Sequence, residues 1–158
     1  MLVELTGAEV ARATRSTIWK LALAQKNGHH NRRYMDPHKA MLFTFQGALA
    51  ELAVSLTTGL VWTAERAAFV HDVTDLEVRS RGSEFGTFRL RSYELPKMDA
   101  TQKIVFCTVM DDHLVYIDGW ATLGELARTW SPSHLSNDQY NVYNIDPAVL
   151  HDIHSVLL

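Results

Sequence analysis

The chain has 158 residues, of which 47% are hydrophobic and 21% are charged, as in an ordinary globular protein. Cys107 is the only cysteine, which excludes a disulfide framework and indicates a reducing compartment. The net charge of −3 makes the field of the whole molecule weakly unfavourable to nucleic acid. The apolar runs are shorter than a membrane span, and the first residues lack the cationic start of a signal peptide. We therefore expect a single cytoplasmic domain over residues 1–158, with no membrane partner.

The N-terminal third of the chain is predicted to be helical. Thr6 can cap a helix over residues 7–26, in which apolar side chains recur at helical spacing. A polar loop over residues 27–37 follows. A second helix is expected over residues 39–58, and Gly59 is placed to end it.

Beyond Gly59 the apolar pattern changes to a period of two, which is typical of strands. Thr122 and Glu125 have the spacing of a capping box and predict a short helix to about residue 128. Asp146 followed by Pro147 predicts a last short helix. This order of elements predicts an α/β fold, or α+β, with a mixed central sheet. Strands are expected at residues 67–71, 74–80, 85–92, 103–110 and 113–118.

Residues 71–79 concentrate three acids and a cation in a strand-like segment. From Asp75 onward charged and apolar residues alternate, so Asp75, Glu77 and Arg79 are predicted to share one face of a strand. Side chains two apart on a strand are roughly 6–7 Å apart, which lets carboxylates share one hard divalent cation. A solvated strand face explains the same alternation.

Two further features bear on chemistry. Glu51 lies in the middle of the apolar second helix, either at the edge of its solvated face or aimed into a site. Arg79, Arg81, Arg89 and Arg91 gather around the acidic segment. Such a basic rim suits an enzyme that acts on phosphates, and it equally suits a salt-bridged hairpin.

Three segments, in this order, resemble the PD-(D/E)xK nuclease superfamily, in particular its small phage and prophage proteins and relatives of Holliday-junction resolvases. The first is Gly47-Ala-Leu-Ala-Glu51, similar to the glutamate-bearing core helix of many members. The second, residues 72–79, looks like the acid followed by Glu-x-Lys. The third comprises residues 106–109 and 113–120, like the later core strands and the Gly-Trp after them. The resemblance covers about residues 41–125 and implies a restriction-endonuclease-like mixed sheet flanked by helices, with an N-terminal helix and a C-terminal helical extension.

Carried over by residue, the resemblance makes Asp72 and Glu77 metal ligands and Glu51 an auxiliary ligand or water-orienting group. Arg79 occupies the position where the superfamily usually has lysine; it cannot act as a base but can stabilise phosphorane charge. The odd offset between Asp72 and Glu77 sends them to opposite faces of a straight strand. A bulge or bend near residues 73–74 would bring them together, and otherwise Asp75 takes the place of Asp72.

The implied function is hydrolysis of DNA phosphodiesters with Mg²⁺, or Mn²⁺, as cofactor, and Arg81, Arg89 and Arg91 would contact the DNA. The alternative is a catalytically inactive protein of the same fold, acting as a DNA- or protein-binding module, including a phage inhibitor of a host factor. A homodimer is compatible with either function. A phage-encoded protein would act in the host cytoplasm.

Overall fold

The computed structural model describes residues 1–26, 36–63, 73–83, 88–91, 99–129, 132–133 and 142–157. Three α-helices lie within these ranges: α1 (Gly7–Lys26), α2 (Pro37–Thr58) and α3 (Leu123–Thr129). Two short 3₁₀ turns, Pro147–Val149 and Ile153–Ser155, lie near the C-terminus. The strands are β1 (Leu2–Glu4), β2 (Leu76–Gly82), β3 (Phe88–Arg91), β4 (Lys103–Val109), β5 (Leu114–Thr122), β6 (Pro132–Ser133) and β7 (Val142–Ile145).

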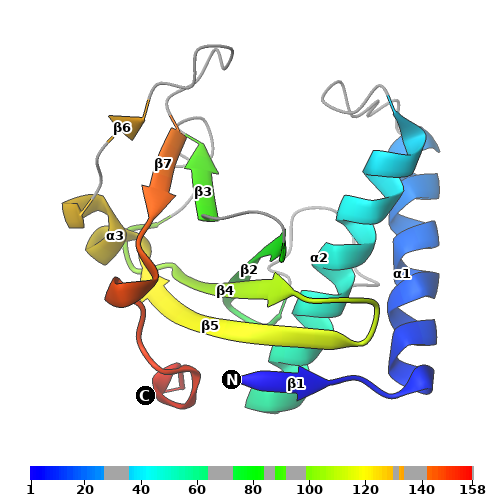
Figure 1. Ribbon diagram of the computed structural model, residues 1–158, viewed down its shortest axis with the longest axis horizontal. Coiled ribbons are helices and arrows are strands. Elements are labelled where there is room, and N and C mark those ends of the chain that lie inside the picture. Colours follow the sequence, from blue (N-terminus) through cyan, green and yellow to red (C-terminus); the bar gives the residue numbers. More distant parts are fainter. Residues whose placement is uncertain are drawn as a thin grey trace.

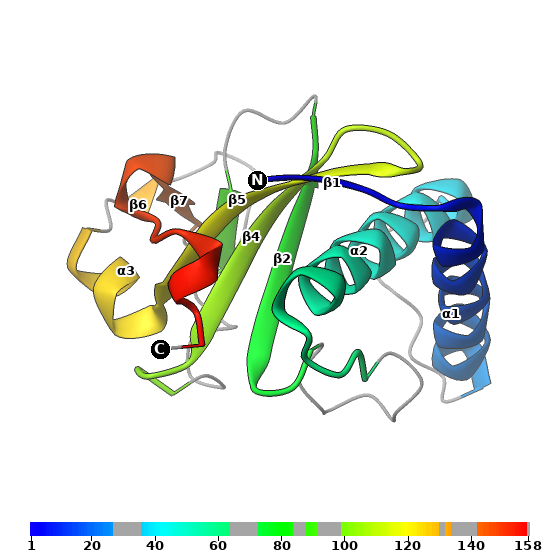
Figure 2. The same cartoon turned by 90° about the horizontal axis from the view of Figure 1, so that it is seen from below.

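The central sheet has the strand order β1-β5-β4-β2. β2 runs parallel to β4, whereas β5 is antiparallel to both β4 and β1, so the sheet is mixed. β3, β7 and β6 form a second, antiparallel sheet. α2 lies beside the central sheet, and α1 lies on the far side of α2 (Figures 1 and 2). The predicted α/β fold with a mixed sheet is confirmed.

Local side-chain chemistry explains where the two long helices begin and end. The backbone N–H of Thr6 donates to Glu9 Oε2 at 2.6 Å, and Glu9 N donates back to Thr6 Oγ1 at 3.4 Å, which is a capping box for α1. Asp36 caps α2 by accepting from His38 N at 2.9 Å. Gly59 ends α2 with a left-handed φ of 72°. The predicted helices over 7–26 and 39–58 are therefore correct to within two residues.

α2 is the most apolar helix of the described chain. Its second half, residues 48–54, is buried against the sheet. By length and composition alone this helix could also cross a membrane, contrary to the expectation that no apolar run is long enough, although the core helix of a soluble protein meets the same criterion. Only 39% of its most apolar stretch is buried, because the first half of the helix lies beyond the sheet.

The two faces of the central sheet pack against different elements. On the α2 face, alternate residues of β2, β4 and β5 join the buried half of α2 in one hydrophobic cluster. On the opposite face, Ile104 and Phe106 of β4 pack with Phe88 and Leu90 of β3 and with α3. Each side chain of β2 and β4 can therefore be assigned to one face or the other.

Three predicted elements differ from the observed ones. The strand expected at 74–80 begins only at Leu76, because Thr74 and Asp75 form a tight turn in which Val73 and Leu76 exchange backbone hydrogen bonds. The strand expected at 113–118 extends to Thr122, as β5. Of the strand expected at 85–92, residues 88–91 form β3, and the rest lies outside the described residues. The last helix is replaced by the two 3₁₀ turns, each started by its own aspartate cap. The strand expected at 67–71 lies outside the described residues.

Candidate functional site

Glu51 of α2 forms hydrogen bonds on the helix side of the central sheet. Its carboxylate accepts hydrogen bonds from Lys20 Nζ of α1, at 2.9 Å to each oxygen, and from Trp62 Nε1 at 2.8 Å. The side chain of Glu51 is 8% exposed and that of Lys20 is 30% exposed. A carboxylate is stable in so apolar a helix because an ammonium and an indole N–H satisfy it.

Glu77 lies on the other face of the central sheet. Its neighbours Leu76 and Val78 pack into the cluster on the α2 face, so Glu77 points away from α2. Its carboxylate pairs with Arg79 Nη2 at 3.0 Å, and the two side chains are about three-quarters buried. The expectation that Glu51 faces Glu77 across a shared metal site is therefore wrong: the sheet separates the two carboxylates.

Asp75 does not lie on the strand face that the alternation of charged and apolar residues predicted for it. It has a φ of 61° in the turn before β2, and this left-handed residue breaks the alternation with Glu77. Its backbone carbonyl accepts from Gln102 Nε2 at 3.0 Å. A turn lies at residues 74–75, close to the bend expected near residues 73–74. Asp72 lies outside the described residues, so its convergence with Glu77 stays a prediction.

The expected basic rim is only partly available for a ligand. Arg81 Nε donates to Thr108 Oγ1 at 3.0 Å, and Arg81 Nη2 lies 3.6 Å from Asp118 Oδ1. The guanidinium carbon of Arg81 also lies 4.1 Å from the centre of the Phe88 ring. Arg89 is exposed on β3, and the side chain of Arg91 lies outside the described part of the chain. Arg79 and Arg81 are thus engaged by acids of the fold itself.

Asp118 and Thr108 form a polar site that was not predicted from the sequence. Thr108 Oγ1 donates to Asp118 Oδ2 at 2.8 Å. Burial raises the pKa of the Asp118 carboxyl above its usual value, and the Thr108 and Arg81 interactions partly offset that rise. Asp118 is the extra residue of a β-bulge, because Phe106 pairs with Gly119 whereas Cys107 pairs with Ile117. The sequence signal for such a bulge is the Asp-Gly dipeptide inside a strand.

One cavity brings Asp75 together with other charged side chains. Its volume is about 430 Å³, and it lies beside the turn at residues 74–75 and the start of β4. Lys103 Nζ donates to the carbonyl of Val156 at 2.5 Å and lies 5.1 Å from the centre of the Trp120 ring. The cavity lining includes Asp75, Asp99, Thr101, Gln102, Lys103 and Val156.

Asp99 is held at the cavity by local hydrogen bonds. Its Oδ1 accepts from the backbone N–H and from the hydroxyl of Thr101, both at 2.8 Å. These bonds, the backbone one first, lower the pKa of Asp99 below its usual value. The carboxylate therefore keeps its negative charge at mildly acidic pH. With Asp75 and Lys103, it places two acids and one cation around a single hollow.

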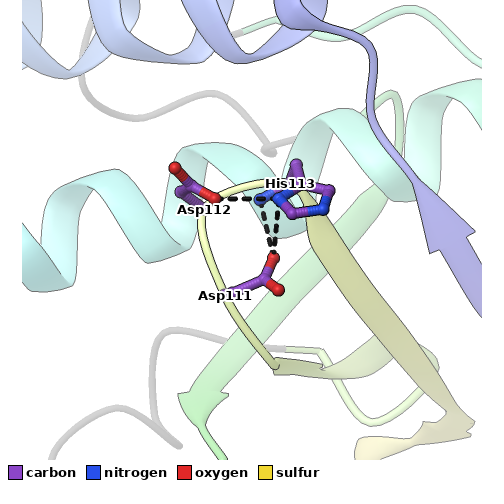
Figure 3. Close-up of side chains that lie close together, drawn as sticks. All are labelled: Asp111, Asp112 and His113. Carbon is purple, nitrogen blue, oxygen red and sulfur yellow. Dashed lines mark hydrogen bonds and ion pairs between the residues drawn. The ribbon is translucent and has the colours of Figure 1, made fainter.

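A second group of possible metal-ligand type lies at the tip of the β4–β5 hairpin. Ligand atoms of Asp111, Asp112 and His113 lie within 4.8 Å of one another, and all three residues are exposed (Figure 3). His113 Nδ1 lies 2.8 Å from Asp112 Oδ1, and that hydrogen bond, followed by the charge of Asp111, raises the pKa of His113. Asp111 Oδ1 also accepts the backbone N–H groups of His113 and Leu114. These bonds account for the cluster as a hairpin turn.

Comparison with known proteins identifies no relative: no family model, no curated protein and no solved structure matches this chain. The assignment of function therefore depends on the residues of this chain alone.

Proposed function

We propose that this protein is a divalent-metal-dependent phosphodiesterase acting on DNA, with its reactive site at the cavity of Asp75, Asp99 and Lys103. The observation that supports the proposal is that Asp75, one of the expected metal ligands, lines a cavity together with a second carboxylate and a lysine. Glu51 and Glu77, the other expected site residues, lie on opposite faces of the sheet and therefore cannot share one metal ion.

The donor set suits a hard cation. Asp75 and Asp99 offer carboxylate oxygens, the ligands that Mg²⁺ and Mn²⁺ prefer, and Mg²⁺ keeps several waters, so two carboxylates suffice. When bound, the metal would supply a more acidic water and neutralise charge on a phosphate.

Lys103 gives this cavity the lysine that position 79 lacks. Its ammonium is oriented by the Val156 carbonyl and has further protons to donate. It can therefore stabilise negative charge on a phosphate oxygen in the cavity. Arg79, at the position usual for lysine in the superfamily that this chain resembles, is paired with Glu77 instead.

A specific observation favours a second function, that of a binding module without catalysis. Glu51, Glu77, Arg79 and Arg81 all have partners within the fold, as residues that stabilise structure do. Such a protein would bind DNA or another protein through its surface without using a metal.

Thermal melts with and without Mn²⁺ and a nicking assay on plasmid and branched DNA separate the two functions. Asp75→Asn is the decisive variant, because asparagine also adopts the left-handed backbone and removes only the charge. We expect Asp75→Asn and Asp99→Asn to abolish most of the metal-dependent stabilisation, which follows RT ln(1 + [L]/Kd), and to abolish nicking.

Glu77→Gln and Asp112→Asn are the matched controls, one on the opposite sheet face and one at the hairpin tip. Both should keep the response to Mn²⁺. A loss of that response in Glu77→Gln alone would move the site to the face of Glu77 and Arg79. No response in the wild type, together with no nicking, would leave the binding module as the function.

A further inference from the structure

Hydrogen bonds within the protein leave the cavity of Asp75 with more acceptors than donors. Thr74 Oγ1 donates its proton to a backbone carbonyl at 3.2 Å, and Thr101 Oγ1 donates to Asp99 Oδ1 at 2.8 Å. Each hydroxyl therefore offers a ligand only its lone pairs. Among the described residues that line the cavity, Lys103 is the only side chain with protons left to donate.

The side-chain amide of Gln102 is the acceptor whose orientation is best defined. Its Nε2 donates to the carbonyl of Asp75 at 3.0 Å and to the carbonyl of Lys103 at 3.3 Å, so both amide protons are used. These two bonds distinguish the nitrogen from the oxygen, and Oε1 accepts no hydrogen bond from the described part of the chain. Oε1 is also accessible, because Ser16 Oγ is the one buried and unpartnered side-chain oxygen among the described residues that are not exposed. Such an oxygen favours a ligand that donates a hydrogen bond and disfavours one that presents an oxygen to it.

The rest of the cavity lining is apolar. It consists of Leu60, Leu76, Val156 and Leu157, and the last of these is 57% exposed. The volume of about 430 Å³ is near the lower end of the range for small-molecule sites, so it suits one nucleotide and excludes a DNA duplex. A flat ring that packs its faces on apolar side chains and donates hydrogen bonds from its edge fits this lining, and nucleobases have this chemistry.

We infer that the cavity binds one unpaired nucleobase with an exocyclic amino group, and that Gln102 Oε1 selects it by accepting a hydrogen bond from that group. The inference rests on the proposed function, in which the two carboxylates hold the metal and Lys103 meets the phosphate. Gln102 and the two threonine hydroxyls then remain for the base. Adenine and cytosine carry an amino group, whereas thymine and uracil carry an oxygen at the corresponding place. In a duplex the amino group already donates to the opposite base, and stacking keeps the base out of a cavity.

Short single strands of oligodeoxycytidine and oligodeoxyuridine provide the test. Their bases differ at one ring position, where cytosine has an amino group and uracil an oxygen, and in the proton on the neighbouring ring nitrogen. Binding is measured by fluorescence anisotropy of labelled strands, with Ca²⁺ in place of Mn²⁺ so that the strands are not consumed. We expect oligodeoxycytidine to bind about tenfold more tightly than oligodeoxyuridine, because uracil would place an oxygen against Gln102 Oε1. Annealing oligodeoxycytidine to its complement should weaken binding at least as much.

Gln102→Met tests the role of the amide oxygen, since methionine has a similar length and no strong acceptor. This variant should bring the ratio of the two affinities close to one. A role of Gln102 in the fold alone would lower both affinities equally and leave their ratio unchanged. Gln25→Met, an exposed glutamine of α1, is the matched control and should keep the wild-type ratio. Melting temperatures verify that both variants fold.

Equal affinity of the wild type for the two strands, or no binding of either, would overturn the inference, and so would an unchanged ratio in folded Gln102→Met. If nicking and the response to Mn²⁺ accompany any of these results, the proposed hydrolysis stands and only the base selection fails. If oligodeoxycytidine is preferred through Gln102 by a protein that neither nicks DNA nor responds to Mn²⁺, the base site stands and the hydrolysis fails.

Discussion

Lys20 Nζ of α1 lies 2.9 Å from both carboxylate oxygens of Glu51 in α2, so one ion pair joins the two long helices. The pair accounts for an acid in the middle of the apolar helix and holds α1 against α2. Removing the cation would leave a buried carboxylate supported by Trp62.

Lys20→Met should lower the free energy of unfolding by about 2 kcal/mol, below the general range for a broken buried pair because Lys20 is 30% exposed. Urea unfolding measures this. Lys26→Met, an exposed lysine of the same helix, should cost less than about 0.5 kcal/mol. Equal costs for the two variants would show that the ion pair contributes nothing. The double variant Lys20→Met/Glu51→Gln should recover part of the free energy of unfolding that Lys20→Met loses, because it also removes the unpaired carboxylate.

Gly119→Ala should be one of the most destabilising single changes in the described chain. Gly119 has a φ of 147°, and an added Cβ would lie 2.5 Å from the carbonyl oxygen of His151 and 2.9 Å from Leu150 Cβ. We expect a loss of at least about 3 kcal/mol in the free energy of unfolding. Gly7→Ala, where nothing lies within 4 Å of the new Cβ, is the control. A mild Gly119→Ala variant would mean that the C-terminal segment does not pack on the bulge.

His113 should make the hairpin tip sensitive to pH. Its pKa is raised in the folded state by Asp112 and Asp111, so the protonated form stabilises the fold. This stability is fully present below the unfolded pKa of about 6.5 and is lost as pH rises through the folded pKa. The difference in melting temperature between wild type and His113→Gln should thus be larger at pH 5.5 than at pH 8.5. A difference independent of pH would contradict the proposed charge interaction.

For Asp118, in contrast to His113, the uncharged form should be the one that stabilises the fold. Because burial raises its pKa, the folded protein binds the proton more tightly than the unfolded chain does. Its contribution to stability is largest below the unfolded pKa of about 3.9 and falls as pH rises through the folded pKa. Asp118→Asn should accordingly lose less stability relative to wild type at pH 7 than at pH 4, measured by urea unfolding. A greater loss at pH 7 would mean that Arg81 outweighs the burial of Asp118.

The elements that could be predicted are those governed by local chemistry. The caps at Thr6 and Thr122 and the glycine at position 59 fix helix ends within a few residues, and Thr122 N does donate to Glu125 Oε2 at 2.8 Å. The mixed sheet followed from the order of helices and strands. These signals act between neighbours in the chain, so they can be recognised without the fold.

The candidate site was harder to predict because its geometry depends on non-local packing. Nothing near Glu51 in sequence indicates that Lys20 would reach it from another helix. The left-handed turn takes Asp75 out of the strand, while Glu77 and Arg79 keep the predicted phase. Asp118 meets Thr108 only because of the register between β4 and β5.

Distant parts of the chain attach to the same strand. Leu2 of β1 pairs with Tyr116 of β5, and His151 exchanges backbone hydrogen bonds with Trp120, four residues further along β5. A pulling force applied between β1 and the C-terminal segment would therefore be carried mainly by β5, without first loading β2 or the helices. We expect a single-molecule stretching experiment to detach one of these terminal contacts first, at low force, and to leave the remaining sheet and the α1–α2 pair intact until a second, higher-force event.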